Sequence, residues 1–111
     1  MASGPATVVA SAARTVTGNS GALDGPEEGN LALLVVASAV SGTTPSMLLS
    51  VEWSNNGTDF APGDTADVFT AIVLAGALAK RFTVKAKYYR IVWTITGTTP
   101  SFTFTISEMG F

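Results

Sequence analysis

The chain has 111 residues, a length that corresponds to one domain with room for a core of its own. It contains no cysteine and no histidine, which excludes disulfide frameworks, thiolate or imidazole metal sites and histidine-based catalysis. Charged residues make up only 13% of the chain and the net charge is −2, so we expect a domain that covers part of its surface with neighbours.

Neither a membrane span nor a leader is expected. The longest nearly apolar run, residues 68–79, has 12 residues, whereas a span needs about 20. The first residues lack the basic region of a signal peptide.

Residues 1–30 are small and turn-rich, and we expect them to form an N-terminal arm with one strand and a loop. The strand falls in residues 7–17, where Val8 and Val9 favour β structure. Because this arm is rich in alanine and serine, we expect its first 20 residues to lie against another subunit. Residues 31–111 form the β-sandwich body of what is one domain overall.

One pentapeptide occurs twice. Residues 42–46 and residues 97–101 both read GTTPS, 55 positions apart, and each lies between segments in which apolar and polar residues alternate. Alternation with a period of two indicates a half-buried strand, and glycine and proline between two such segments indicate a turn. We therefore predict two hairpins related by an internal repeat, the second spanning residues 88–108.

Three further segments have distinct patterns. Residues 30–40 are apolar at both alternating positions, which is typical of a strand covered on both faces, in the middle of a sandwich or under a partner subunit. Residues 54–58 contain Asn-Gly, the strongest short hairpin signal. In residues 66–79, alanine and leucine favour a helix, but Gly76 costs about 1 kcal/mol in a helix and the β-branched residues favour strands. We predict two strands that turn near residues 75–76.

The phase of the alternation changes near residues 87–88. Phe82 and Val84 are apolar at even positions, whereas Tyr89 and Ile91 are apolar at odd positions. A regular strand cannot change phase, so a turn or bulge is predicted there. The chain then has about eight short strands and no convincing helix. We predict the all-β class, with a single antiparallel β-sandwich that is jelly-roll-like.

Five of the six basic residues fall within residues 80–90. Basic residues with neighbouring tyrosines suit single-stranded nucleic acid, but the acidic balance of the whole chain opposes it, so we predict no nucleic-acid partner. We interpret the run as a charged face that protects a strand edge or pairs with acids of a neighbour. The candidate partner-binding residues come from this run and from the N-terminal strand: Val8, Val9, Arg14, Lys80, Arg81, Lys85 and Lys87.

Oxygen-bearing side chains gather in one loop region that begins with the Asn-Gly turn: Asn55, Asn56, Asp59, Asp64 and Asp67. Their spacing is not that of an EF-hand, and turns favour asparagine and aspartate for reasons of their own. We assign them to turn formation and predict no metal and no cofactor.

Trp53, Trp93, Phe102 and Phe104 are the residue types of a carbohydrate platform, but they lie on the apolar side of their strands, so we assign them to the core. Glu52 and Glu108 occupy nearly matching places in the repeat, as a glycosidase pair would need, but nothing else supports that reading. We predict that the chain is not an enzyme.

Residues 41–60 (SGTTPSMLLSVEWSNNGTDF) and 88–106 (YYRIVWTITGTTPSFTFTI) resemble small virion structural proteins of tailed bacteriophages. They cover about a third of the chain. The family pattern has an SGT-x-P loop, a strand ending in an Asp-Gly hairpin, and a closing PSFTF. Asn56 stands here where aspartate is commoner, and Lys87 replaces an expected arginine. The resemblance does not extend to the N-terminal arm.

The resemblance implies a capsid decoration (cement) protein on the outer surface of a phage head. Such a protein bridges neighbouring subunits of the major capsid protein, and we expect it to be a homotrimer. One alternative is a tail, neck or baseplate component. Another, from a different class, is a carbohydrate-binding module for host adsorption.

Overall fold

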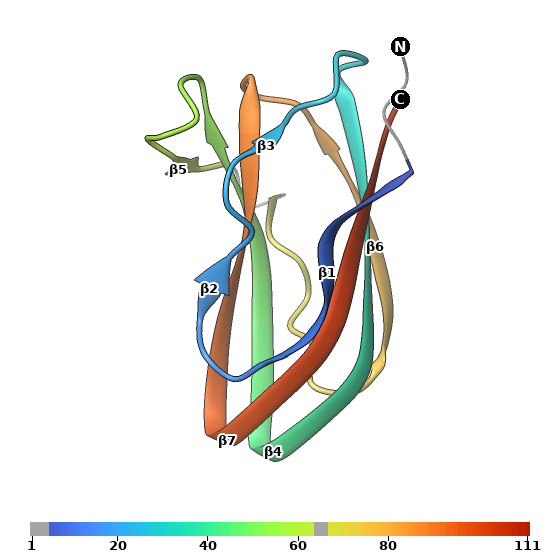
Figure 1. The fold of residues 1–111 in the computed structure, drawn as a ribbon, viewed down its shortest axis with the longest axis vertical. Helices are drawn as coiled ribbons and strands as arrows, with labels where there is room; N and C mark the ends of the chain where they lie inside the picture. Colours follow the sequence, from blue (N-terminus) through green and yellow to red (C-terminus); the bar gives the residue numbers. More distant parts are fainter. Residues whose placement is uncertain (1–4, 64–66) are drawn as a thin grey trace.

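The computed structural model describes residues 5–63 and 67–111 (Figure 1). The described residues form an all-β fold in which every strand pair is antiparallel, as the sequence predicts. Hydrogen bonds join seven strands into one sheet. The strands are β1 (Ala6–Arg14), β2 (Gly18–Asn19), β3 (Leu23–Asp24), β4 (Asn30–Ser54), β5 (Ala61–Pro62), β6 (Gly76–Thr83) and β7 (Tyr88–Gly110).

Two long strands form the frame of the sheet. β4 and β7 are 25 and 23 residues long and pair with each other almost from end to end. Both turn sharply in the middle (Figure 1). The positions of Trp93 and Phe104 show how sharply β7 turns. An extended strand of 11 residues spans about 36 Å, and yet the ring centroids of these two residues are 5.3 Å apart. The two-stranded ribbon therefore folds back on itself, and its halves face each other.

The predicted hairpins around the two GTTPS segments are wrong. The arms of β7 do not pair with each other, because each pairs with one arm of β4. Residues 42–46 and 97–101, which we call the corner segments, are bends within continuous strands. The mistake has a physical reason: two half-buried arms joined by glycine and proline have the same local pattern in a hairpin and in a bent strand.

The internal repeat is confirmed by backbone geometry. Gly42 and Gly97 have φ values of 113° and 122°, and Thr44 and Thr99 have φ values of 46° and 47°. Positive φ is uncommon for a β-branched residue. Its occurrence at both equivalent threonines shows that the two corner segments adopt the same conformation.

The pairing register adds a symmetry axis to this repeat. A shift of 55 residues carries the pair Ser41–Ser101 onto the pair Thr96–Ser46, and both occur in the ladder. The same shift carries the pair Thr43–Thr98 onto itself. The two corner segments are therefore related by an approximate twofold axis that passes between the two strands.

The corner segments divide the sheet into two halves. The first half contains β1, β6, residues 30–41 of β4 and residues 101–110 of β7. The second half contains β2, β3, β5 and the remaining arms of β4 and β7. Because hydrogen bonds continue from one half to the other through the corners, the predicted sandwich with jelly-roll connections is not confirmed. The seven described strands also fall one short of the predicted number.

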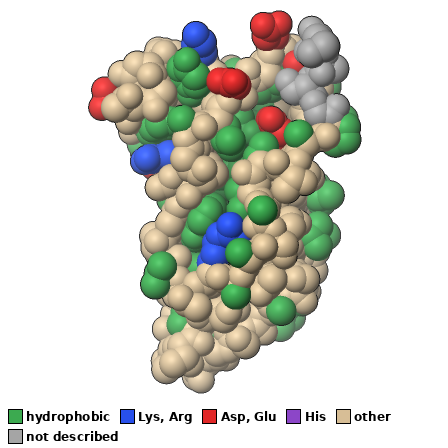
Figure 2. All heavy atoms as spheres, in the orientation of Figure 1, with side chains coloured by type: hydrophobic (Ala, Val, Ile, Leu, Met, Phe, Trp, Pro, Cys, Tyr) green, Lys and Arg blue, Asp and Glu red, His purple; other side chains and the backbone are tan. Residues whose placement is uncertain are grey.

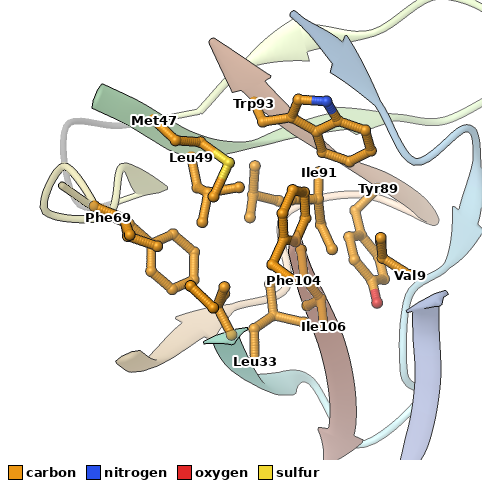
Figure 3. Close-up of a cluster of buried hydrophobic side chains, with 14 of the residues drawn as sticks. Val9, Leu33, Met47, Leu49, Phe69, Tyr89, Ile91, Trp93, Phe104 and Ile106 are labelled. Carbon is orange, nitrogen blue, oxygen red and sulfur yellow. The ribbon is translucent and has the colours of Figure 1, made fainter. Parts of the chain in front are cut away.

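The core lies between the two halves (Figure 3). Leu31, Leu33 and Val35 of β4 point into it, as do all four aromatic residues that the sequence analysis assigns to the core. The even-numbered Leu34 and Val36 point outward and are 42% and 39% exposed. The prediction that residues 30–40 are covered on both faces is therefore wrong within this chain.

The N-terminal arm belongs to the same sheet. β1 pairs with β7 from Ala6 opposite Glu108 to Arg14 opposite Phe102, and Val9 lies in the core, 4% exposed. After β1, the hydroxyls of Thr17 and Ser20 accept hydrogen bonds from backbone N–H groups of β7. The expectation that the first 20 residues lie against another subunit is therefore wrong for residues 5–20; residues 1–4 are outside the described range.

The Asn-Gly hairpin is confirmed, since β4 and β5 pair on either side of it. The Asn56 side-chain oxygen accepts hydrogen bonds from the N–H groups of Thr58 and Asp59, at 2.9 and 2.8 Å, and its amide donates to the Asp59 carboxylate. This is the predicted turn chemistry. Asp64 lies outside the described residues.

The segment after this turn is fastened by one buried carboxylate. Asp67 accepts a hydrogen bond from Trp53 Nε1 at 3.0 Å and pairs with Lys85 Nζ at 3.1 Å. A Cβ at Gly63 would overlap the Asp67 carboxylate.

Of the two strands predicted in residues 66–79, only the second forms, as β6; the first is reduced to isolated bridges at Val68 and Ile72. The predicted turn near residues 87–88 is confirmed by the link from β6 to β7.

Gly42→Ala and Gly97→Ala should destabilise the protein, and by similar amounts. A Cβ at either position would lie 2.8–3.0 Å from backbone atoms of the opposite corner segment, in addition to the strain of positive φ. We expect each change to lower the free energy of unfolding by about 2–4 kcal/mol, measured by chemical denaturation. Gly21→Ala is the control: its φ is 79° but nothing lies within 4 Å, so about 1 kcal/mol is expected. Clearly unequal costs at Gly42 and Gly97 would contradict the symmetry.

Trp93→Ala and Phe104→Ala should each cost about 3–5 kcal/mol of unfolding free energy, because each leaves a large cavity between the halves. Their rings are in edge-to-face contact. A double-mutant cycle should therefore give a coupling of about 0.5–1.5 kcal/mol. A variant with unchanged stability would show that these rings do not join the halves.

Candidate functional site

The outer face of the first half carries a shallow groove. Two rows of side chains cross three strands there, because Leu34 pairs with Ala79 and Ser107, and Ala32 pairs with Arg81 and Met109. Side chains at paired positions point to the same face of a sheet. We call this surface the outer groove. Its lining residues are Pro5, Ala32, Leu33, Leu34, Ala79, Lys80, Arg81, Ser107, Glu108 and Met109.

The hollow results from differences in side-chain length. Ala32, Ala79 and Ser107 are short, whereas Leu34 and Met109 are long and stand beside them. The groove has a volume of about 380 Å³. Leu34 and Met109 are 42% and 44% exposed, and Phe111 continues the apolar surface at 43%. An apolar strip of this kind, on a chain whose core is already filled, is typical of an interaction surface.

Two cations of β6 lie near the outer groove. The Arg81 guanidinium lies over the Phe111 ring at 5.2 Å, and Lys80 Nζ lies 6.0 Å from the Phe82 ring centroid. Neither forms an ion pair with any residue in the described ranges. Arg81 pairs with Ala32 and therefore stands on the face of the groove, whereas Lys80 pairs with Leu33, which points into the core. Arg81 gives the rim of the groove a positive charge, which favours a partner carboxylate beside an apolar projection.

The structure brings together only two of the seven predicted partner-binding residues. Lys80 and Arg81 line the outer groove. Lys85 forms an ion pair with the buried Asp67 carboxylate. Lys87 lies 5.3 Å from the Tyr88 ring centroid, at another cavity. The basic run thus splits among several surfaces rather than forming one face.

The three predicted residues of the N-terminal strand also lie elsewhere. Val8 is half-buried against the core and Val9 is buried in it, so Val9 has no surface to offer a partner. Arg14 is partly exposed beside the Trp93 and Phe104 rings, at the opposite end of β1 from Pro5.

The apolar residues of the groove are those that sequence reasoning missed. Leu34 was visible in the sequence as an apolar residue at the second alternating position, as was Val36, which lies outside the groove. That signal shows that a strand has two apolar faces, but it does not show which face the chain itself covers. Met109 and Ala79 gave no signal, because their position opposite β4 follows from the register alone.

A second cavity, of about 870 Å³, has a lining that is partly polar and partly apolar. It is lined by Asp24, Glu27, Glu108 and Lys87 among others. Acidic side chains gather at this end of the molecule, away from the corner segments (Figure 2). Among the residues that the structure describes, no group of three or more carboxylates is arranged to hold a metal ion.

Two carboxylates of interest for catalysis are each bound by a different partner. Glu52 pairs with Arg90 at 2.6 Å. Glu108 accepts a hydrogen bond from the Tyr89 hydroxyl at 2.7 Å. Tyr89 is fully buried, and burial, followed by the hydrogen bond to Glu108 and its charge, raises the pKa of this hydroxyl far above its usual value. The Glu108 contact therefore ties the two arms of β7 together.

Replacing Tyr89 by Phe should change how stability depends on pH. An unfolded tyrosine ionises near pH 10, whereas Tyr89 in the folded protein keeps its proton at higher pH. The stability that this raised pKa provides is therefore complete below pH 10 and is lost as the pH rises further. We expect the unfolding free energy of the native chain to fall above pH 10 by about 1.4 kcal/mol per unit from this group. Tyr89→Phe should lack that component in denaturation curves at pH 9–12. Identical pH profiles for the two proteins would mean that Tyr89 ionises freely in the fold.

No helix among the described residues is long and apolar enough to cross a membrane. No family model, curated protein or solved structure matches this chain.

Proposed function

We propose that this chain is a structural protein of a tailed-phage virion, and that it decorates the outer surface of the head. The outer groove is the surface with which it binds the major capsid protein. The protein acts by binding, without cofactor or catalysis, and it bridges neighbouring capsid subunits as a homotrimer.

The observation that carries this proposal is the apolar outer groove with its basic rim. The core between the two halves is complete without Leu34, Met109 or Phe111, so folding gives no reason for these side chains to be apolar. A partner that covers them gains the hydrophobic free energy that the folded chain leaves unused. The resemblance of the corner segments and the strands around them to small phage virion proteins supplies the class of partner.

Such a protein would strengthen a head by mass action. A ligand that binds the assembled shell and not its separate subunits stabilises the shell by about 2.7 kcal/mol per site when present at 100 times its dissociation constant. A stable contact of ordinary size buries about 800 Å² on each partner. The groove supplies only the centre of such an area, so the surrounding first-half surface is part of the contact.

The alternatives in the same virion are a tail, neck or baseplate position, and the groove is compatible with those partners also. A carbohydrate-binding module has less support, because the tryptophans that would form a stacking platform, Trp53 and Trp93, are only 6% and 5% exposed.

The direct test adds the purified chain to phage heads that lack it and measures co-sedimentation and resistance of the heads to heat. We expect saturable binding and a higher temperature of head disruption. Binding to isolated tails but not to heads would move the protein to the tail. Binding to neither would reject the virion proposal. Light scattering of the free protein tests the trimer.

Leu34→Glu should abolish decoration while leaving the fold intact. The side chain already faces water, so stability should change by less than about 0.5 kcal/mol, but a buried unpaired carboxylate at the contact should weaken binding at least tenfold. Leu48→Glu is a matched control, because Leu48 has the same exposure, 42%, on the other arm of β4. If Leu48→Glu weakens binding and Leu34→Glu does not, the contact surface is on the second half.

A further inference from the structure

Arg14 occupies a fixed position at the open side of the folded sheet. Its guanidinium carbon lies 5.0 Å from the Trp93 ring centroid and 4.7 Å from that of Phe104. Because Trp93 and Phe104 belong to opposite arms of β7 and pack edge to face, Arg14 contacts both halves where β1 ends. Guanidinium groups favour aromatic neighbours of this kind.

Two hydrogen bonds orient the guanidinium group. Its two terminal nitrogens donate to the carbonyl oxygens of Ala12 and Ala10, at 3.1 and 3.2 Å, both on its own strand. A guanidinium group has five N–H donors, so three remain after these two bonds. In the described ranges, residues 5–63 and 67–111, Arg14 forms no ion pair.

Arg90 provides an internal comparison. Its guanidinium carbon lies 4.6 Å from the Phe60 ring centroid, an arrangement similar to that of Arg14. In that case the fold also supplies a carboxylate, Glu52, at 2.6 Å. Arg14 has the same type of aromatic support and lacks the acid.

The surface around Arg14 is neutral and open to a partner. Ala10, Ser11, Ala12 and Ala13 are exposed, small and uncharged, and Val16 is 71% exposed. Short neighbours let an incoming group reach the guanidinium without rearrangement.

We propose that Arg14 is a recognition site for a carboxylate, the side chain of an aspartate or glutamate on a protein partner. The guanidinium group is planar, and an arginine that its neighbours already position binds carboxylates through paired hydrogen bonds and loses little conformational freedom in doing so. The site lies apart from the outer groove and does not require that the partner be a capsid protein.

The test uses the ¹⁵N-labelled full chain and two peptides that differ in one group, acetyl-Gly-Glu-Gly-amide and acetyl-Gly-Gln-Gly-amide, at matched ionic strength. We expect the glutamate peptide to shift the Arg14 Nε–H and Trp93 Nε1–H resonances saturably, with a dissociation constant of roughly 10–100 mM. The glutamine peptide should not shift them. The Arg90 Nε–H resonance is the control within the same molecule, because its carboxylate is already present.

Two variants separate recognition from a role in packing alone. Arg14→Met keeps a long apolar side chain over the rings and should lose the response to glutamate. Arg14→Lys keeps the charge without the planar group and should bind at least about threefold more weakly. An equal response to both peptides, an equal response at Arg90, or a glutamate response that persists in Arg14→Met would overturn the proposal. If Arg14→Met does not fold, the wild-type titration with its Arg90 control still decides. No phage head is used, so this result is independent of the decoration test.

Discussion

The fold depends on the close crossing of the two corner segments. At that point the backbones of the two long strands approach each other closely, with Gly42 against residues 98–100 and Gly97 against residues 43–45. Only glycine provides both the positive φ and the absence of a Cβ that this crossing requires. Because the crossing lies near the twofold axis of the β4–β7 ribbon, both strands bend together and stay paired. The core between the halves is a consequence of this bend.

The remaining strands close the sides that the bent ribbon leaves open. On one side, Phe69 and Phe82 meet at 5.5 Å, and Asp67 fastens the irregular segment to Trp53 and Lys85. On the other side, β1 covers the core with Val9, and Arg14 reaches both arms of β7. Most pairings join residues far apart in sequence, so chain entropy must be lost before the core compensates. The closing contacts therefore stabilise a ribbon that would not hold its bend in isolation.

The outside of the sheet favours contacts through its faces over contacts through its edges. On β1, Arg14 occupies the carbonyl groups of Ala10 and Ala12, which another strand would need as acceptors. On β6, Lys80 and Arg81 place charges along the edge, a common protection against strand addition. The outer groove and the Arg14 surface are both reached without breaking the sheet. A protein built in this way can bind a partner surface and remain folded when the partner is absent.

The sequence alone determined the all-β class, the core aromatics, the Asn-Gly hairpin, the phase change before β7 and the internal repeat. Each of these follows from local alternation, from the conformational preferences of glycine and asparagine, or from identity between two segments. The tertiary structure decided whether the GTTPS segments close hairpins or bend strands, because that depends on which arm is the hydrogen-bonding partner. It also decided that β1 joins its own sheet, since an Ala- and Ser-rich strand packs equally well on its own chain or another. The outer groove arises in the same way: the register of three strands places short side chains beside Leu34, and no local pattern encodes that register.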